Sequence, residues 1–232
     1  MNETTISVII PAFNEEKYIK RTILAILSWS INSQIIVVDD GSTDRTLQIA
    51  NNLMEGNENI NVISLEKNGG KGNALNKGLQ YTKGNIVMFL DADLGDSAKE
   101  AIKLIYPILN DNIDMTVAII PSTNTKAGFG LAKNLAKKGI YYLTGFHSKA
   151  PLSGQRAVKK KLLEQIANFA DGFGIEVGLT IDGLHKGWLI KEIEVSLRHR
   201  ESKRDLIGFM HRGKEFADIT KALYIRRRWV RL

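Results

Sequence analysis

Two aspartates that could hold a metal ion close a short apolar run in the first half of the chain. Residues 86–90 are Ile-Val-Met-Phe-Leu, and Asp91 and Asp93 follow them. The run is typical of a buried strand, in which side chains two residues apart point to the same side. Neighbouring carboxylates repel each other unless a cation lies between them, and Mg²⁺ and Mn²⁺ favour oxygen ligands. We therefore expect Asp91 and Asp93 to bind a divalent cation whose free positions accept phosphate oxygens.

Three loops add polar groups that suit a nucleotide. Residues 11–16 follow the first predicted strand and expose backbone N–H groups, although Asn14 could equally cap the next helix. The second predicted strand ends near Asp40, whose carboxylate can accept hydrogen bonds from a base or ribose. The glycine-rich residues 68–73 carry Lys71 and suit phosphate contact, but they are also compatible with a flexible turn. They match neither the P-loop nor the dinucleotide fingerprint.

The elements that must position these residues alternate along the chain. Apolar runs predict strands at residues 6–10, 35–38, 61–65, 86–90, 115–120 and 189–197. Helical periodicity predicts helices at residues 16–30, 44–54, 73–82, 97–109, 131–144, 159–169, 175–185 and 205–224. This order predicts a single α/β domain with a mainly parallel sheet and helices on both faces. Ligands bind at the carboxyl ends of the strands in such sheets, so the loops above should converge there.

Composition limits the chemistry and the location. The 232 residues include no cysteine, which excludes disulfides, thiolate metal sites and a cysteine nucleophile. No apolar run approaches the roughly 20 residues that span a bilayer. The first five residues are polar and do not resemble a signal sequence. These features predict a cytoplasmic protein.

The positive charge is concentrated at the C-terminus. Residues 198–232 contain 11 Lys and Arg against four Asp and Glu, which equals the whole net charge of +7. The last nine residues mix four arginines with apolar side chains, a pattern that suits peripheral contact with an anionic membrane or an ordinary solvated tail. Nucleic-acid binding is not expected, because the basic residues belong to no recognisable module.

As an ordered set, the loops of the first half resemble the nucleotide-sugar-binding half of a family 2-like GT-A glycosyltransferase. The resembling segments are residues 8–16, 37–44, 70–75 and 90–93. The resemblance implies a GT-A fold and transfer of a hexose from a nucleoside diphosphate sugar, with UDP as the expected nucleotide. It implies that the donor is bound by Pro11, Ala12, Phe13, Asn14, Glu15, Asp40, Gly41, Ser42, Lys71, Asp91 and Ala92.

The second half is similar to the acceptor-side motifs of glucosyl-3-phosphoglycerate synthases, in residues 151–157, 172–178 and 197–200. The resemblance implies that His199 joins Asp91 and Asp93 as a metal ligand, and that Glu176 and Asp93 are catalytic. It assigns the acceptor side to Ser153, Gly154, Gln155, Arg156 and Arg200. Without the resemblance, His199 would be interpreted as a surface residue and Glu176 as an acid favoured by a helix N-terminus.

One departure leaves the acceptor open. Relatives that use phosphoglycerate carry an Arg-x-Thr element after the fifth strand, and residues 126–131 here lack it. The alternatives are a polyprenyl-phosphate glycosyltransferase at the membrane surface and a sugar-nucleotide-binding module without turnover. The stereochemistry and a possible homodimer are also open. We divide the chain into a donor half (1–96), an acceptor and catalytic half (97–204), and a closing helix with a basic tail (205–232).

Overall fold

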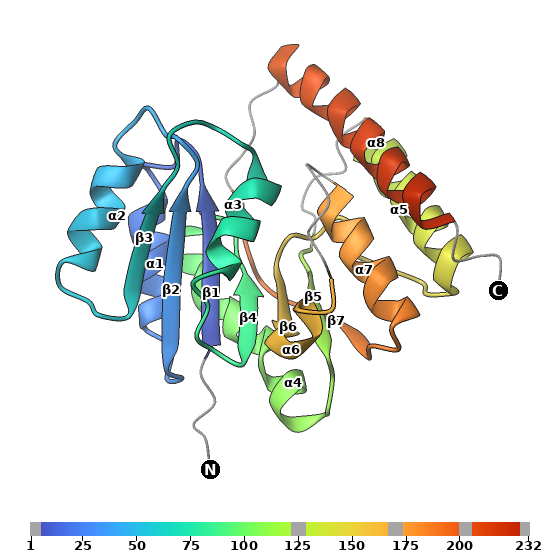
Figure 1. Cartoon of the computed structure of the whole chain (residues 1–232), viewed down its shortest axis with the longest axis horizontal. Coiled ribbons are helices and arrows are strands. Elements are labelled where there is room, and N and C mark those ends of the chain that lie inside the picture. The colour runs from blue at the N-terminus through green and yellow to red at the C-terminus, as the bar shows by residue number, and fades with distance from the viewer. Residues whose placement is uncertain (1–5, 122–128, 167–173, 200–205, 228–232) are drawn as a thin grey trace.

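Seven strands form one mixed sheet in the order β3-β2-β1-β4-β6-β5-β7 (Figure 1). The computed structural model describes residues 6–121, 129–166, 174–199 and 206–227. The strands are β1 (Ile6–Ala12), β2 (Ser33–Asp39), β3 (Ile60–Ser64), β4 (Ile86–Phe89), β5 (Met115–Ile119), β6 (Arg156–Lys159) and β7 (Ile190–Glu194). The helices are α1 (Ile19–Leu27), α2 (Thr46–Met54), α3 (Lys71–Leu79), α4 (Tyr106–Asn110), α5 (Phe129–Thr144), α6 (Lys160–Leu163), α7 (Ile175–His185) and α8 (Leu206–Arg226), with a 3₁₀ segment, η1 (Gly95–Leu104). The predicted single α/β domain with a mainly parallel sheet is confirmed.

The strand β6 was not predicted. It pairs antiparallel with β4 on one side and with β5 on the other, while the remaining pairs are parallel. Four residues with a charge at each end give no periodic signal, so only the tertiary pairing identifies this strand. The helix predicted at residues 159–169 is correspondingly wrong in extent. Within this range, the helix α6 covers only Lys160–Leu163. Residues 167–169 lie outside the part that the structure describes.

The predicted helix at residues 97–109 is also different in the structure. A 3₁₀ segment from Gly95 to Leu104 is followed by the short helix α4. Pro107 lies in the first turn of α4, where its missing N–H and fixed φ are tolerated. The same proline would interrupt one continuous helix, and this accounts for the division.

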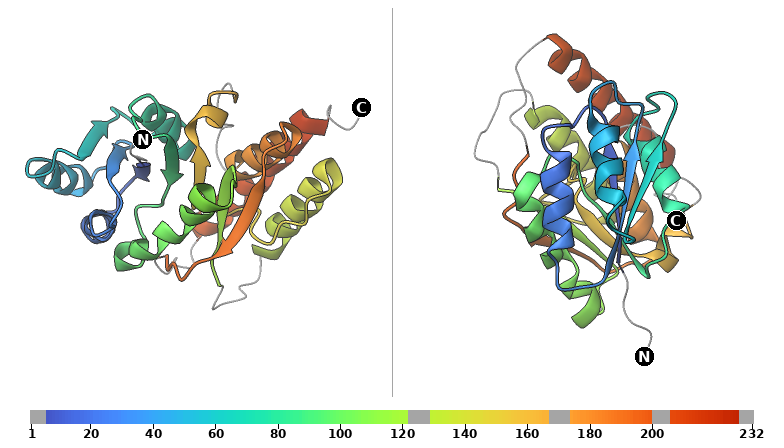
Figure 2. Two further views of the ribbon diagram at one scale, coloured as in Figure 1. Left: turned by 90° about the horizontal axis from the view of Figure 1, so that it is seen from below. Right: turned by 90° about the vertical axis from the view of Figure 1, so that its left-hand side faces the viewer.

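Both faces of the sheet are buried. Along β1, Val8 and Ile10 face the cluster that includes α1 and η1, while Ile9 faces the cluster that includes α3 and α7. Figure 1 shows α3 in front of the sheet and α1 behind it, and the right-hand view of Figure 2 shows the strands between them. Burial on both faces explains why β1, β2 and β4 are mostly apolar along their length.

A third layer covers α7. A separate apolar cluster joins α5, α7 and α8, with Ala136, Ile140, Val177, Ile181 and Ile219 among its buried members. Figure 1 shows α8 crossing in front of α5, with α7 between this pair and the sheet. Over the ranges that the structure describes, none of the helices combines the length and apolar character that crossing a membrane requires. The division into three segments and the cytoplasmic location stay predictions.

Candidate active site

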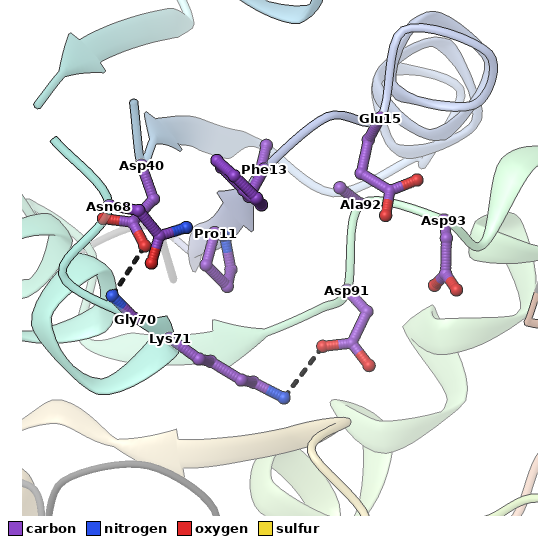
Figure 3. A pocket seen from close by; sticks show the side chains of 11 residues that line it. Pro11, Phe13, Glu15, Asp40, Asn68, Gly70, Lys71, Asp91, Ala92 and Asp93 are labelled. Atoms are coloured by element: carbon purple, nitrogen blue, oxygen red, sulfur yellow. Dashed lines mark hydrogen bonds and ion pairs between the residues drawn. The ribbon is translucent and has the colours of Figure 1, made fainter. Parts of the chain in front are cut away.

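A cavity of about 300 Å³ opens at the carboxyl ends of β1, β2 and β4 (Figure 3). It is lined by Pro11, Ala12, Phe13, Glu15, Asp40, Asn68, Gly70, Lys71, Asp91, Ala92 and Asp93. Most of the residues predicted to bind a donor therefore surround one space. Asn68 and Gly70 were not singled out from the sequence, although they belong to the glycine-rich loop that was.

Three predicted donor residues, Asn14, Gly41 and Ser42, do not line the cavity but lie where two loops contact each other. Oδ1 of Asn14 accepts hydrogen bonds from the backbone N–H of Thr43 at 2.8 Å and of Asp44 at 3.4 Å. The backbone N–H of Asn14 donates to Oγ of Ser42 at 3.0 Å. Gly41 has φ +73°, and a Cβ there would lie 2.9 Å from backbone atoms of Lys67 and Asn68. These contacts hold the loop after β1 against the loop after β2, and the helix cap considered for Asn14 is not seen.

Asp40 positions the glycine-rich loop. Its Oδ1 accepts a hydrogen bond from the N–H of Gly69 at 2.9 Å, and its Oδ2 accepts one from Gly70 at 2.7 Å. Only 3% of Asp40 is exposed. The φ of +85° at Gly70 lets the chain turn directly into α3. Asp40 thus places the start of α3, and with it Lys71, at the cavity (Figure 3).

Asp91, Asp93 and His199 form a group that can hold a metal ion. Each offers one ligand atom, and these atoms lie within 4.8 Å of one another. Two carboxylates and one imidazole are a donor set that fits Mg²⁺ or Mn²⁺. The aspartates follow β4 in a turn and are not part of a strand, so the argument from strand alternation was wrong in its detail. The turn brings the carboxylates together all the same.

His199 reaches the aspartates from the segment after β7. Its Nδ1 is 3.0 Å from Oδ1 of Asp93 and 3.8 Å from Oδ2 of Asp91. The segment is tied to η1, because the N–H of Arg198 donates to Oγ of Ser97 at 3.0 Å. Burial opposes protonation of His199, but the hydrogen bond to Asp93 and the charge of Asp91 raise its pKa above the usual value. The group therefore attracts positive charge.

Lys71 lies between two carboxylates. Its Nζ is 2.9 Å from Oδ1 of Asp91 and 3.3 Å from Oε1 of Glu176. Burial alone would lower the pKa of Lys71, but Asp91 and Glu176 outweigh burial and raise it. Burial would likewise raise the pKa of Asp91, yet Lys71 and His199 hold it below its usual value. Lys71 is consequently a fixed ammonium ion at the wall of the cavity.

Gly154 leaves the space that Lys71 occupies. A Cβ at Gly154 would lie 2.3 Å from Nζ of Lys71 and 3.3 Å from Oε1 of Glu176. The loop before β6 therefore touches the same ion cluster that the first half of the chain supplies. The acceptor role predicted for Gly154 is untested, but it lies beside the predicted donor residue Lys71 and the catalytic candidate Glu176.

Arg156 is buried beneath this loop. Its exposed fraction is 1%, and its guanidinium donates to the carbonyl of Ser153 at 2.7 Å and to Oγ1 of Thr180 at 2.8 Å. Burial lowers its pKa to about 10, against the opposing charges of Glu176 and Glu192. These bonds join the loop to α7. Contact with an acceptor stays a prediction for Arg156 and Ser153, and Arg200 lies outside the described residues.

A second hollow adjoins the first at Asp93. It measures about 590 Å³ and is lined by residues of α1, η1 and the segment before His199. Arg21 and Asp96 form an exposed ion pair at its wall. Asp93 is a lining residue of both spaces, so the possible metal ligands separate them.

Two proteins illustrate the sequence similarity. An uncharacterised glycosyltransferase of Haemophilus influenzae is 37% identical over 94 residues, which cover 40% of this chain and 38% of that protein. The glucosyl-3-phosphoglycerate synthase of Mycobacterium tuberculosis is 31% identical over an alignment 231 residues long. This alignment covers 90% of this chain and 70% of that enzyme.

The fold and the family agree with these relatives. A crystal structure of the M. tuberculosis synthase with Mg²⁺ and UDP matches with a TM-score of 0.78 and 29% identity, covering 96% of this chain and 79% of that one. Another, with Mn²⁺, UDP and phosphoglyceric acid, matches with a TM-score of 0.78 and 30% identity, covering 96% and 78%. The family model described as "Glycosyl transferase family 2" matches residues 7–171. The chain therefore belongs to glycosyl transferase family 2, and it is a glycosyltransferase with the GT-A fold.

Proposed function

We propose that this protein transfers a hexose from a UDP-sugar to a hydroxyl or phosphate acceptor, with Mg²⁺ or Mn²⁺ as its cofactor. One observation carries the proposal. The fixed ammonium of Lys71 and the possible metal ligands Asp91 and Asp93 line the same cavity as the predicted donor residues. A nucleoside diphosphate needs both features, a shaped pocket for the nucleoside and positive charge for the phosphates.

The nucleoside is proposed to lie between the loops that follow β1 and β2. Phe13 is 42% exposed, so a flat base can pack against its ring. Asp40 uses each carboxylate oxygen once, for Gly69 and Gly70, and each oxygen retains a lone pair for a polar group of the ligand. Uridine and glucose are favoured because similar structures of 28–30% sequence identity contain UDP or UDP-glucose.

During transfer the bond between the sugar's anomeric carbon and the diphosphate breaks, and negative charge accumulates on the leaving diphosphate. The ammonium of Lys71 is already held beside the cavity by Asp91 and Glu176, so it stabilises this charge without rearrangement. A divalent ion bound at Asp91, Asp93 and His199 would supply Lewis-acid stabilisation of the same charge.

Glu176 acts in this scheme by holding Lys71. Its side chain is 9% exposed and its Oε1 is 3.3 Å from the ammonium. The carboxylate enters from the first turn of α7, where the helix dipole favours an acid. A direct contact between Glu176 and the sugar or acceptor remains a prediction.

The acceptor is proposed only as a class. Several similar synthase structures contain phosphoglyceric acid, but the Arg-x-Thr element expected of such enzymes is absent from residues 126–131 here. Three further points stay predictions: a polyprenyl phosphate as the acceptor, contact of the C-terminal tail with a membrane, and a homodimer. Residues 228–232 of that tail are outside the described part.

A donor panel tests the proposal. Purified protein is incubated with UDP-glucose, UDP-galactose and GDP-mannose, each with Mn²⁺ or with EDTA, and release of the nucleoside diphosphate is measured. We expect Mn²⁺-dependent release of UDP from a UDP-hexose. Preferential use of GDP-mannose would refute the uridine assignment, and equal rates in EDTA would refute the metal requirement.

The acceptor class is tested in the same assay. Phosphorylated three-carbon acids, free sugars and polyprenyl phosphate in liposomes are added separately, and the products are identified by mass spectrometry. Hexose found on a small acceptor supports a reaction in solution, and hexose found only on the polyprenyl phosphate supports the membrane alternative.

A further inference from the structure

The side chain of Gln155 contacts Asp91 twice. Its Oε1 accepts a hydrogen bond from the backbone N–H of Asp91 at 2.9 Å, and its Nε2 donates to Oδ2 of Asp91 at 2.5 Å. A backbone N–H only donates and a carboxylate only accepts, so these two partners fix which way the amide faces. A glutamine is well suited here, since it offers a donor and an acceptor together without adding charge.

Gln155 and Asp91 are 64 residues apart in the sequence, and strand pairing in the sheet brings them together. Phe89 of β4 is paired with Arg156 of β6, so Gln155 is the next residue toward the cavity. The backbone carbonyl of Gln155 accepts a hydrogen bond from the N–H of Ala118 at 2.9 Å, on the side of β5. Only 1% of Gln155 is exposed. The backbone that carries the amide is therefore held between β4 and β5.

The two oxygens of Asp91 have different partners. Oδ1 faces Lys71 at 2.9 Å, while Oδ2 faces Gln155 and is also the oxygen 3.8 Å from Nδ1 of His199. Without Gln155, the carboxylate could rotate and give both oxygens to Lys71. The amide keeps Oδ2 directed toward His199, whose Nδ1 is also 3.0 Å from Oδ1 of Asp93.

We propose that Gln155 is a positioning residue that orients Asp91 for the divalent cation and so sets the affinity for Mg²⁺ or Mn²⁺. This inference rests on the proposed function, because it needs the cation site. It differs from the acceptor-side role expected from the sequence, since the amide of Gln155 is occupied by Asp91. Loss of an outer hydrogen bond to a metal ligand typically weakens metal affinity by about 10-fold to 100-fold.

The test is Mn²⁺ binding, measured by electron paramagnetic resonance without donor or acceptor. Gln155→Met keeps the length of the side chain and removes both hydrogen bonds, and Gln155→Asn keeps the amide but is one methylene too short to make both. We expect each variant to bind Mn²⁺ about tenfold more weakly than the wild type. Should the Met variant not fold, the Asn variant alone decides the question.

Gln34→Met is the matched control. Gln34 is 8% exposed, and it bonds to Ser7 and Asn61 at the opposite end of the parallel strands. We expect this variant to bind Mn²⁺ like the wild type even if it is less stable. UDP binding in EDTA provides a second readout, which we expect to be the same in the wild type and in both Gln155 variants.

Each remaining outcome counts against the inference. Unchanged Mn²⁺ affinity in the Gln155 variants would overturn it and leave the proposed function intact. A parallel loss of Mn²⁺ affinity and of UDP affinity in EDTA would indicate general distortion of the site and would also overturn it. If the wild type bound no Mn²⁺, the metal role in the proposed function would fail together with this inference.

Discussion

The site has two parts that are built in different ways: one with the predicted donor residues (residues 6–93, called the donor side) and one with the predicted acceptor residues (residues 151–199, called the acceptor side). On the donor side, neighbouring loops are joined by hydrogen bonds between side chains and nearby backbone N–H groups, as Asn14 and Asp40 show. On the acceptor side, Gln155 contacts Asp91 and Glu176 contacts Lys71, so both side chains reach residues of the first half of the chain. Arg156 is buried and joins its own loop to α7. The donor side is thus fixed by contacts between adjacent loops, whereas the acceptor side is fixed by the packing of the sheet and α7.

The comparison predicts different consequences of mutation. Changes to the donor side and its ion cluster should affect turnover directly. Changes to buried polar groups on the acceptor side should act first on stability or on the geometry of Lys71.

The largest effect is expected for Asp93→Asn. The change removes a carboxylate from the possible metal site and from Nδ1 of His199, so we expect transfer to fall by about 10³-fold. The measurement is kcat/KM for donor hydrolysis at saturating Mn²⁺. Asp96→Asn is the control, because Asp96 pairs with Arg21 on the surface and its loss should leave the rate unchanged. Equal rates in both variants would contradict a metal at Asp93.

Lys71→Met should lower kcat/KM by about 10²-fold, because one preorganised positive group at the diphosphate is lost. Lys77→Met is the matched control on the same helix, since Lys77 lies at the surface near Gln80. A loss that appears only in the thermal melting temperature of Lys71→Met, with wild-type kinetics, would show that Lys71 has a structural role only.

Gly154→Ala should reduce the rate by about tenfold with little change in stability. The new Cβ would displace the flexible end of Lys71, which can move without disturbing the backbone. Gly56→Ala serves as the control, because nothing lies within 4 Å of a Cβ there. A stable Gly154→Ala protein with full activity would show that the close approach of Gly154 to Lys71 and Glu176 does not matter for turnover. It would contradict a functional contact between the donor side and the acceptor side.

Arg156→Met should destabilise the protein by about 2 kcal/mol, because the buried hydroxyl of Thr180 and the partly buried carbonyl of Ser153 would lose their donor. Urea unfolding gives the free energy, and Arg21→Met, which removes an exposed ion pair, should leave the free energy of unfolding nearly unchanged. If Arg156→Met instead raised the KM for the acceptor at unchanged stability, the acceptor role inferred from the sequence would be correct and the contrast drawn above would be wrong.

The smallest effect is expected for Asp44→Ala. Oδ1 of Asp44 accepts the N–H of Thr46 at 2.9 Å at the start of α2, and its Oδ2 accepts the N–H of Glu16 at 3.1 Å. Loss of hydrogen bonds of this kind costs about 1 kcal/mol. Asp111→Ala, at the surface beside Lys191, is the control.

The effect of Asp44 should depend on pH. Burial opposes ionisation, but the hydrogen bonds from Thr46 and Glu16 outweigh it and lower the pKa of Asp44. A group whose pKa is lowered by folding stabilises the protein above its unfolded pKa of about 3.9, and this contribution disappears as the pH falls through the folded value. Urea unfolding of wild type and variant should therefore converge in strong acid. A difference that persisted there would show that the charge of Asp44 is not what stabilises the loop.

The sequence by itself determined the parallel part of the sheet and most of the cavity wall. The strands β1, β2 and β4 are buried on both faces, so their apolar runs were visible directly. The polar loops that follow them had to meet at one edge, because parallel strands end together, and Pro11, Asp40 and Asp91 do line one cavity.

Only the tertiary structure decided the position of β6 and the contacts of the buried polar residues. Four residues carry too little periodicity to define a strand, and β6 exists because β4 and β5 pair with it from both sides. The amide of Gln155 meets Asp91 through that pairing, and the ammonium of Lys71 meets Glu176 through the packing of α7. Such contacts join residues that are distant in the chain, and no local pattern records them.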